Sequence, residues 1–93
     1  MSIVKVKNRK RTSNNKLPEG CSSWKEYWKD NKEYWPSKCC VKDCKNEAEV
    51  GAHVYKTGES GIVYIIPMCN EHNNPNNEDV MPIDEKYLVE IED

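Results

Sequence analysis

The spacing of apolar and polar residues changes along the chain, and the first regular spacing predicts a helix. Trp24, Tyr27 and Trp28 follow one another at i, i+3 and i+4, which places them on one helix face. Ser23 and Glu26 form a capping box just before and within this run, so the first amides of a helix would be satisfied there. We predict a capped helix whose aromatic stripe packs on the rest of the domain.

The next pattern predicts a β-hairpin. Residues 48–55 are small, β-branched or aromatic at most positions, a polar loop with Gly58 and Gly61 follows, and residues 62–66 form an apolar run. Pro67 has no N–H with which to continue a strand ladder, so we expect the second strand to stop just before Met68 and Cys69.

Beyond the hairpin the pattern is weaker. Residues 82–84 contain a proline and predict a turn. Residues 87–92 alternate apolar and polar side chains in their last part and predict a terminal strand that covers a sheet edge. We therefore predict a single domain over residues 21–93.

The first 20 residues differ from this domain in composition. Residues 1–18 carry six lysines and arginines and no acid, which predicts a mobile basic arm over residues 1–20. Ile3, Val4 and Val6 are exceptions and favour a short edge strand. Residues 78–93 carry seven acids and one lysine, so the two ends have opposite charge. A basic arm is a footprint for the phosphates of DNA or RNA, although it could equally fold against the acidic tail.

Size and cysteine content indicate that something besides apolar packing holds the fold together. The chain has 93 residues, is 37% hydrophobic and contains no Phe, so its core must be small. Five cysteines are an odd number, and no hydrophobic signal segment precedes them, which predicts the cytoplasm and metal ligands in place of disulfides. No apolar run is long enough to span a membrane, so we expect a soluble protein without a membrane partner.

Cysteine and histidine spacing predicts a structural zinc site. Cys40 and Cys44 have three residues between them, Cys69 and His72 have two, and the predicted hairpin separates the pairs. Two close pairs brought together by a hairpin are typical of tetrahedral structural zinc, and sulfur and imidazole favour zinc over calcium or magnesium. Cys39 is the alternative first ligand. We choose Cys40 because the shorter loop is the commoner form.

These residues resemble the treble-clef zinc proteins and, among them, the His-Asn-His (HNH) endonucleases. The resemblance covers residues 39–75 and rests on the cysteine knuckle, Gly-Ala-His-Val at residues 51–54, Ile-Pro-Met-Cys at 66–69 and the Cys-x-x-His-Asn that follows. It implies an α+β fold made of a zinc knuckle, a β-hairpin and a short helix, to which the helix near Trp24 would be an N-terminal addition. Small bacterial and phage zinc proteins of uncharacterised function are similar.

In the nuclease family a strand histidine activates water, and a residue on the following helix holds Mg²⁺ or another divalent cation. The resemblance implies these catalytic roles for His53 and Asn73. Tyr64 stands where the family has its middle asparagine, and Ala52 stands where it has an acid beside the histidine. His53 has two other interpretations, as a packed or hydrogen-bonded strand residue and as a zinc ligand.

Three functions follow as hypotheses. The first is a zinc-stabilised module that binds DNA or RNA through the basic arm without strong catalysis. The second is a metal-dependent HNH endonuclease that uses His53. The third is a protein-interaction factor of phage or mobile-element origin that docks on a host protein complex.

Overall fold

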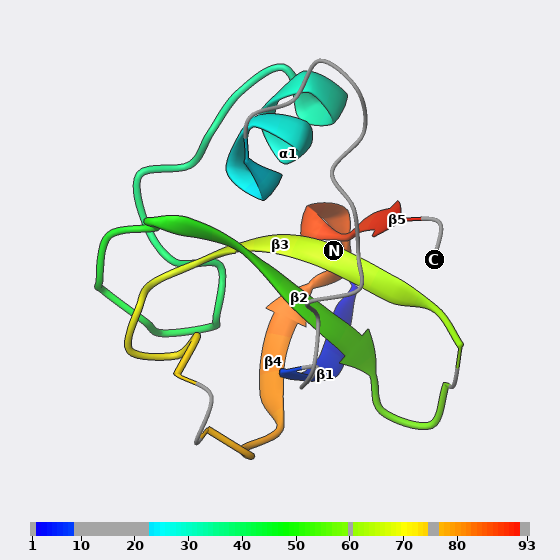
Figure 1. Cartoon of the computed structure of the whole chain (residues 1–93). Coiled ribbons are helices and arrows are strands. Elements are labelled where there is room, and N and C mark those ends of the chain that lie inside the picture. Colours follow the sequence, from blue (N-terminus) through cyan, green and yellow to red (C-terminus); the bar gives the residue numbers. More distant parts are fainter. Residues whose placement is uncertain (1, 9–22, 60, 75–76, 92–93) are drawn as a thin grey trace.

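The computed structural model describes residues 2–8, 23–59, 61–74 and 77–91, and in these it shows one α-helix and one antiparallel sheet (Figure 1). Five strands form the sheet in the order β4-β1-β2-β3-β5. The elements are β1 (Ile3–Asn8), α1 (Trp24–Lys32), β2 (Val50–Lys56), β3 (Val63–Met68), β4 (Met81–Asp84), a 3-10 turn (Glu85–Tyr87) and β5 (Val89–Ile91). The expected mixture of helix and strand is therefore present.

The predicted hairpin and the predicted terminal strand are both confirmed. β2 pairs with β3 in antiparallel register from Val50 opposite Met68 to Val54 opposite Tyr64. Gly58 lies in the loop between them with a φ of 88°, a conformation that glycine adopts without strain. β5 pairs with β3 and forms one edge of the sheet.

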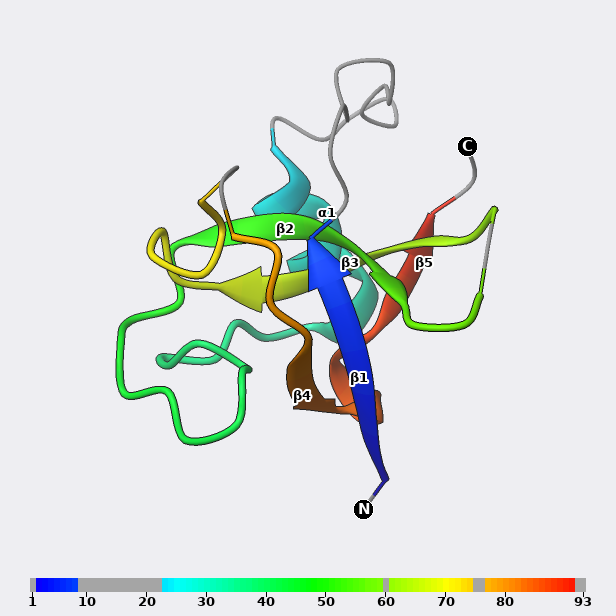
Figure 2. The same ribbon diagram turned by 90° about the horizontal axis from the view of Figure 1, so that it is seen from below.

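β1 is an inner strand, although the sequence placed it in a basic arm or at a sheet edge. It pairs with β4 on one side and β2 on the other, and Figure 2 shows it on the side of the molecule away from α1. Val6 is fully buried, which explains why this basic segment is ordered into the sheet. The remainder of the predicted arm, residues 9–20, lies outside the described residues.

Two prolines lie within strands, contrary to prediction. Pro67 is part of β3, and its carbonyl accepts the N–H of Cys40 on the side facing away from β2. The nitrogen of Pro67 faces this same side. Because β5 pairs with β3 only as far as Ile65, no hydrogen bond of the sheet is lost through the missing N–H. Pro82 is in β4 at the other edge of the sheet, where proline is tolerated, and the predicted turn is wrong.

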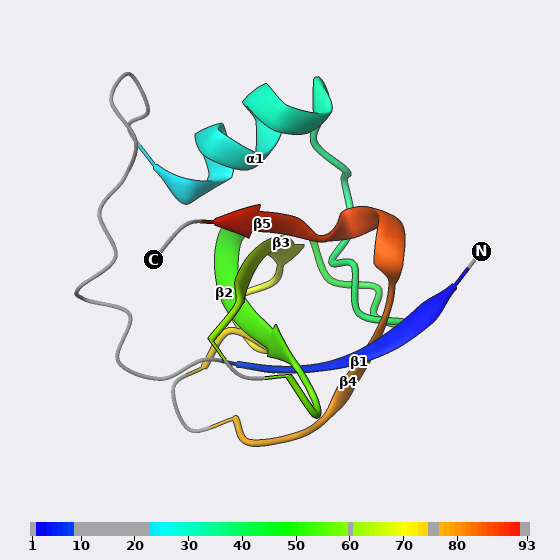
Figure 3. The ribbon, with the colours of Figure 1, turned by 90° about the vertical axis from the view of Figure 1, so that its right-hand side faces the viewer.

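The sheet separates two apolar clusters. On one face, residues of β1, β2, β3 and β4 pack with the cysteines, whereas on the other face α1 packs on β3 and β5. Figure 3 shows α1 on one side of β3 and β5, with β1 and β4 on the far side. Side chains alternate along β2, so Ala52 and Val54 face the cysteines while His53 faces α1.

The helix forms as its capping box predicts, and its aromatic stripe packs on the sheet. Ser23 Oγ accepts the N–H of Glu26 at 3.2 Å. Trp28 is fully buried, and its Nε1 donates to the carbonyl of Tyr87 at 2.8 Å. None of the described helices has the length and apolar character needed to cross a membrane.

Candidate metal centre

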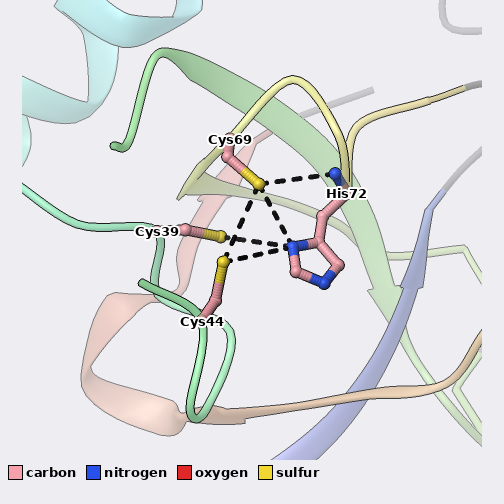
Figure 4. A group of neighbouring side chains, drawn as sticks. All are labelled: Cys39, Cys44, Cys69 and His72. Carbon is pink, nitrogen blue, oxygen red and sulfur yellow. Dashed lines mark hydrogen bonds between the residues drawn. The ribbon is translucent and has the colours of Figure 1, made fainter. Parts of the chain in front are cut away.

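The first half of the site is the loop from Cys39 to Cys44. The N–H of Cys39 donates to the carbonyl of Asn46 at 2.9 Å, and the N–H of Cys44 donates to the carbonyl of Val41 at 3.0 Å. Asp43 takes a left-handed conformation with a φ of 66°, which lets the chain turn back. These bonds fold the loop so that both cysteine side chains point to one place (Figure 4).

The second half of the site is the turn that follows β3. Cys69 comes directly after the strand, its carbonyl accepts the N–H of Asn73 at 3.0 Å, and its sulfur accepts the N–H of His72 at 3.4 Å. A single turn forms here in place of the short helix that the resemblance implies. It brings the His72 ring back over Cys69.

Four side chains meet at this point: Cys39, Cys44, Cys69 and His72. Their ligand atoms all lie within 4.8 Å of one another. His72 Nδ1 is 3.1 Å from the sulfur of Cys69, 3.5 Å from that of Cys44 and 3.8 Å from that of Cys39. The sulfurs of Cys44 and Cys69 are 3.9 Å apart.

These separations suit a tetrahedral metal ion. Zinc bonds of ~2.3 Å to sulfur and ~2.0 Å to nitrogen place neighbouring ligand atoms roughly 3.5–3.8 Å apart. The observed distances scatter around that value, and three thiols with one imidazole form a donor set that favours zinc. The group can therefore hold a metal ion such as zinc.

The group contains Cys39 where the sequence analysis chose Cys40. Cys39 and Cys40 are both buried in the apolar cluster, but neighbouring side chains in this segment point to different sides of the backbone. Its N–H donates to Pro67 at 3.1 Å, and the next residue, Val41, is bridged to Ile83 of β4. Because these bonds fix Cys40 against the sheet, Cys39 is the residue left to face Cys44.

The thiols differ in acidity. Burial raises the pKa of Cys39 to about 12 and also raises the pKa of Cys40. Burial acts in the same direction on Cys69, but hydrogen bonds from the His72 N–H and the Asn46 amide outweigh it and lower its pKa to about 7. Cys69 is therefore the readiest of these three to become a thiolate, the form that binds metal.

Asparagines support the site, in roles that the sequence pattern did not indicate. Asn8 and Asn77 both donate to the carbonyl of His72, at 2.6 Å and 2.8 Å. The bond from Asn8 ties the second turn to the end of β1. Asn46 donates to the sulfur of Cys69 at 3.7 Å. The position of Asn46, two residues after Cys44, is a signal in the sequence that could have indicated its role. Nothing in the sequence near Asn8 indicates its bond to His72.

The two residues implied as catalytic lie on different sides of the sheet. His53 faces α1, where its ring packs edge to face on Trp24 with centroids 4.8 Å apart. Asn73 is in the turn beside the cysteine cluster, on the other face. Tyr64 also faces the cysteine side, and its hydroxyl donates to Glu59 at 3.1 Å.

Comparison with known proteins gives no family for this chain. No protein-family model matches it, and neither a curated protein nor a solved structure matches it significantly. The case for function therefore rests on the cysteine and histidine cluster and the fold around it.

Proposed function

We propose that the protein is a small zinc-stabilised binding module in which Cys39, Cys44, Cys69 and His72 hold one structural zinc. The observation that carries the proposal is the mutual distance of the four ligand atoms, all within 4.8 Å. These four side chains would fill all four positions of a tetrahedron, which is typical of structural zinc and would leave no position for substrate.

Zinc would join parts of the chain that are distant in sequence. Cys39 and Cys44 come from the loop before β2, and Cys69 and His72 come from the turn after β3. The arrangement of knuckle, hairpin and second ligand pair supports a treble-clef centre whose helix is reduced to one turn, with α1 as an N-terminal addition. We propose this likeness to the HNH proteins at the level of the zinc centre.

Removal of zinc tests the proposal. Zinc binding free energy on the order of 10 kcal/mol would be coupled to folding, because the unfolded chain has no preformed site. We expect one zinc per chain by native mass spectrometry and loss of the cooperative thermal transition after chelation, with recovery when zinc is restored. A protein that folds identically with and without chelator, or that carries no zinc when purified reduced, would contradict it.

We also propose that this module binds nucleic acid through β1 and the basic residues that follow it. Val6 points into the core, so Lys5 and Lys7 lie on the opposite face of the sheet, which α1 does not cover at β1. Tyr55 is paired with Lys7 and shares that face. Lysines for phosphates beside an aromatic ring support contact with a single strand.

Salt dependence tests this second part. Binding of single-stranded DNA or RNA should weaken as salt rises, and Lys5→Ala with Lys7→Ala should reduce the slope of log K against log salt by about 2. Lys29→Ala with Lys32→Ala on α1 removes the same charge elsewhere and should change the slope little. Binding that ignores salt, or that both variants weaken equally, would contradict this surface.

The other two hypotheses gain no support here. An endonuclease needs His53 near the divalent cation that Asn73 would hold, and the packing of His53 on Trp24 argues against it. Docking on a host protein complex and a cytoplasmic location remain predictions from sequence.

A further inference from the structure

We propose that Asn46 is a positioning residue of the metal centre, whose side-chain amide holds the sulfur of Cys69 in place. This inference rests on the zinc site proposed above. It concerns a residue that is not itself a ligand and that lies exposed at the rim of the cluster.

Asn46 contacts both halves of the site. Its backbone carbonyl accepts the N–H of Cys39 at 2.9 Å. Its side-chain Nδ2 lies 3.7 Å from the sulfur of Cys69 and 3.0 Å from Oε2 of Glu71. Asn46 therefore connects the two halves of the site: its main chain bonds the loop of Cys39, and its side chain bonds the turn of Cys69.

Glu71 determines which way the amide faces. A carboxylate only accepts hydrogen bonds, so the NH₂ end of the Asn46 side chain, and not its oxygen, must point toward Glu71. The same NH₂ group has a second hydrogen, and the sulfur of Cys69 is the acceptor within its reach. Glu71 thus directs a donor at the sulfur.

The Asn46 amide offsets negative charge on the sulfur of Cys69. Three thiolates carry more negative charge than one Zn²⁺ neutralises, and hydrogen bonds to sulfur offset the excess. Cys69 receives two, from the His72 N–H at 3.4 Å and from Asn46. Loss of the second bond should weaken metal binding and increase electron donation from sulfur to the metal.

Asn70 provides a matched control. It is an exposed asparagine next to Cys69, and its amide also donates to a carboxylate, that of Glu49, but among the described residues no hydrogen bond joins its side chain to a sulfur. Truncation of Asn70 therefore removes the same kind of side chain, also close to Cys69, without removing a hydrogen bond to the sulfur of Cys69.

The experiment measures zinc affinity by competition with a chromophoric chelator and, in the Co²⁺-substituted protein, the energy of the sulfur-to-metal charge-transfer band. Asn46→Ala should weaken zinc binding about tenfold and shift the band to lower energy. Asn46→Asp should weaken binding further because it places a second carboxylate beside Glu71. Asn70→Ala should match wild type in both readouts.

A double variant separates the sulfur bond from the Glu71 bond. Asn46→Asp with Glu71→Gln restores a hydrogen bond between these two positions with donor and acceptor exchanged, but leaves the sulfur without a side-chain donor. The charge-transfer band should stay shifted in this variant, because the sulfur still lacks its donor. Recovery of both the zinc affinity and the wild-type band energy would overturn the inference. Wild-type behaviour of Asn46→Ala would overturn it too while leaving the zinc proposal intact, whereas failure of wild type to bind zinc or Co²⁺ would overturn both.

Discussion

At the scale of single residues, His53 is a packing residue of the α1 face. It is half-buried, and its ring lies edge to face on Trp24, across the sheet from the four ligand side chains. We predict that His53→Ala keeps one zinc per chain and lowers the free energy of unfolding by about 1 kcal/mol, the order of one aromatic contact. Metal analysis with thermal denaturation checks this, and loss of zinc from the variant would place His53 in the metal site after all.

Spacing in the sequence is enough to identify three of the four clustered side chains but not the fourth. Cys44, Cys69 and His72 stand in close pairs around a predictable hairpin. The choice between Cys39 and Cys40 depends on which side of the loop packs on the sheet, and that is set by bonds from the loop to Pro67 and to β4. Loop length alone carries no information about those contacts, so it could not distinguish the two cysteines.

Among the helices and strands, those set by local sequence patterns were predicted correctly, whereas the pairing of strands distant in sequence was not. The helix and the hairpin are formed by residues close in sequence, and both are where their caps, glycines and apolar runs indicate. β1 and β4 pair with each other across more than 70 residues, so the sequence indicated β1 only as a short edge strand and β4 only as a turn. Tertiary burial of Val6 and Ile83 overrides those local signals.

Gly51 determines how closely the helix can approach the hairpin. A Cβ added at this position would lie 2.7 Å from the backbone carbon of Trp24, and backbone cannot move aside as a flexible side chain can. We predict that Gly51→Ala lowers the free energy of unfolding by about 1–3 kcal/mol while zinc stays bound. Denaturant titration measures the change.

Gly58 supplies the control for that variant. Its added Cβ would meet no atom within 4 Å, and its φ of 88° is one that Asn tolerates better than most residues. Gly58→Asn should therefore cost less stability than Gly51→Ala. An equal or larger loss at Gly58 would mean that loop strain, and not the contact with α1, dominates.

At the scale of the whole molecule, the proposed zinc compensates for a divided core. The sheet splits the apolar side chains into two clusters, and neither is large for a chain of 93 residues. The four proposed ligands would join the loop before β2 to the turn after β3, and the hydrogen bond from Asn8 to the carbonyl of His72 extends that link to β1. One ion would thereby fix the relative positions of three segments.

Zinc stoichiometry in two neighbouring variants tests the proposal that Cys39, Cys44, Cys69 and His72 hold one zinc. Cys39→Ala and Cys40→Ala make the same truncation at two adjacent buried cysteines. Native mass spectrometry of the reduced proteins should find one zinc per chain in wild type and in Cys40→Ala, and none in Cys39→Ala. Zinc retained by Cys39→Ala, zinc lost from Cys40→Ala, or the absence of zinc from wild type would contradict this assignment of the ligands.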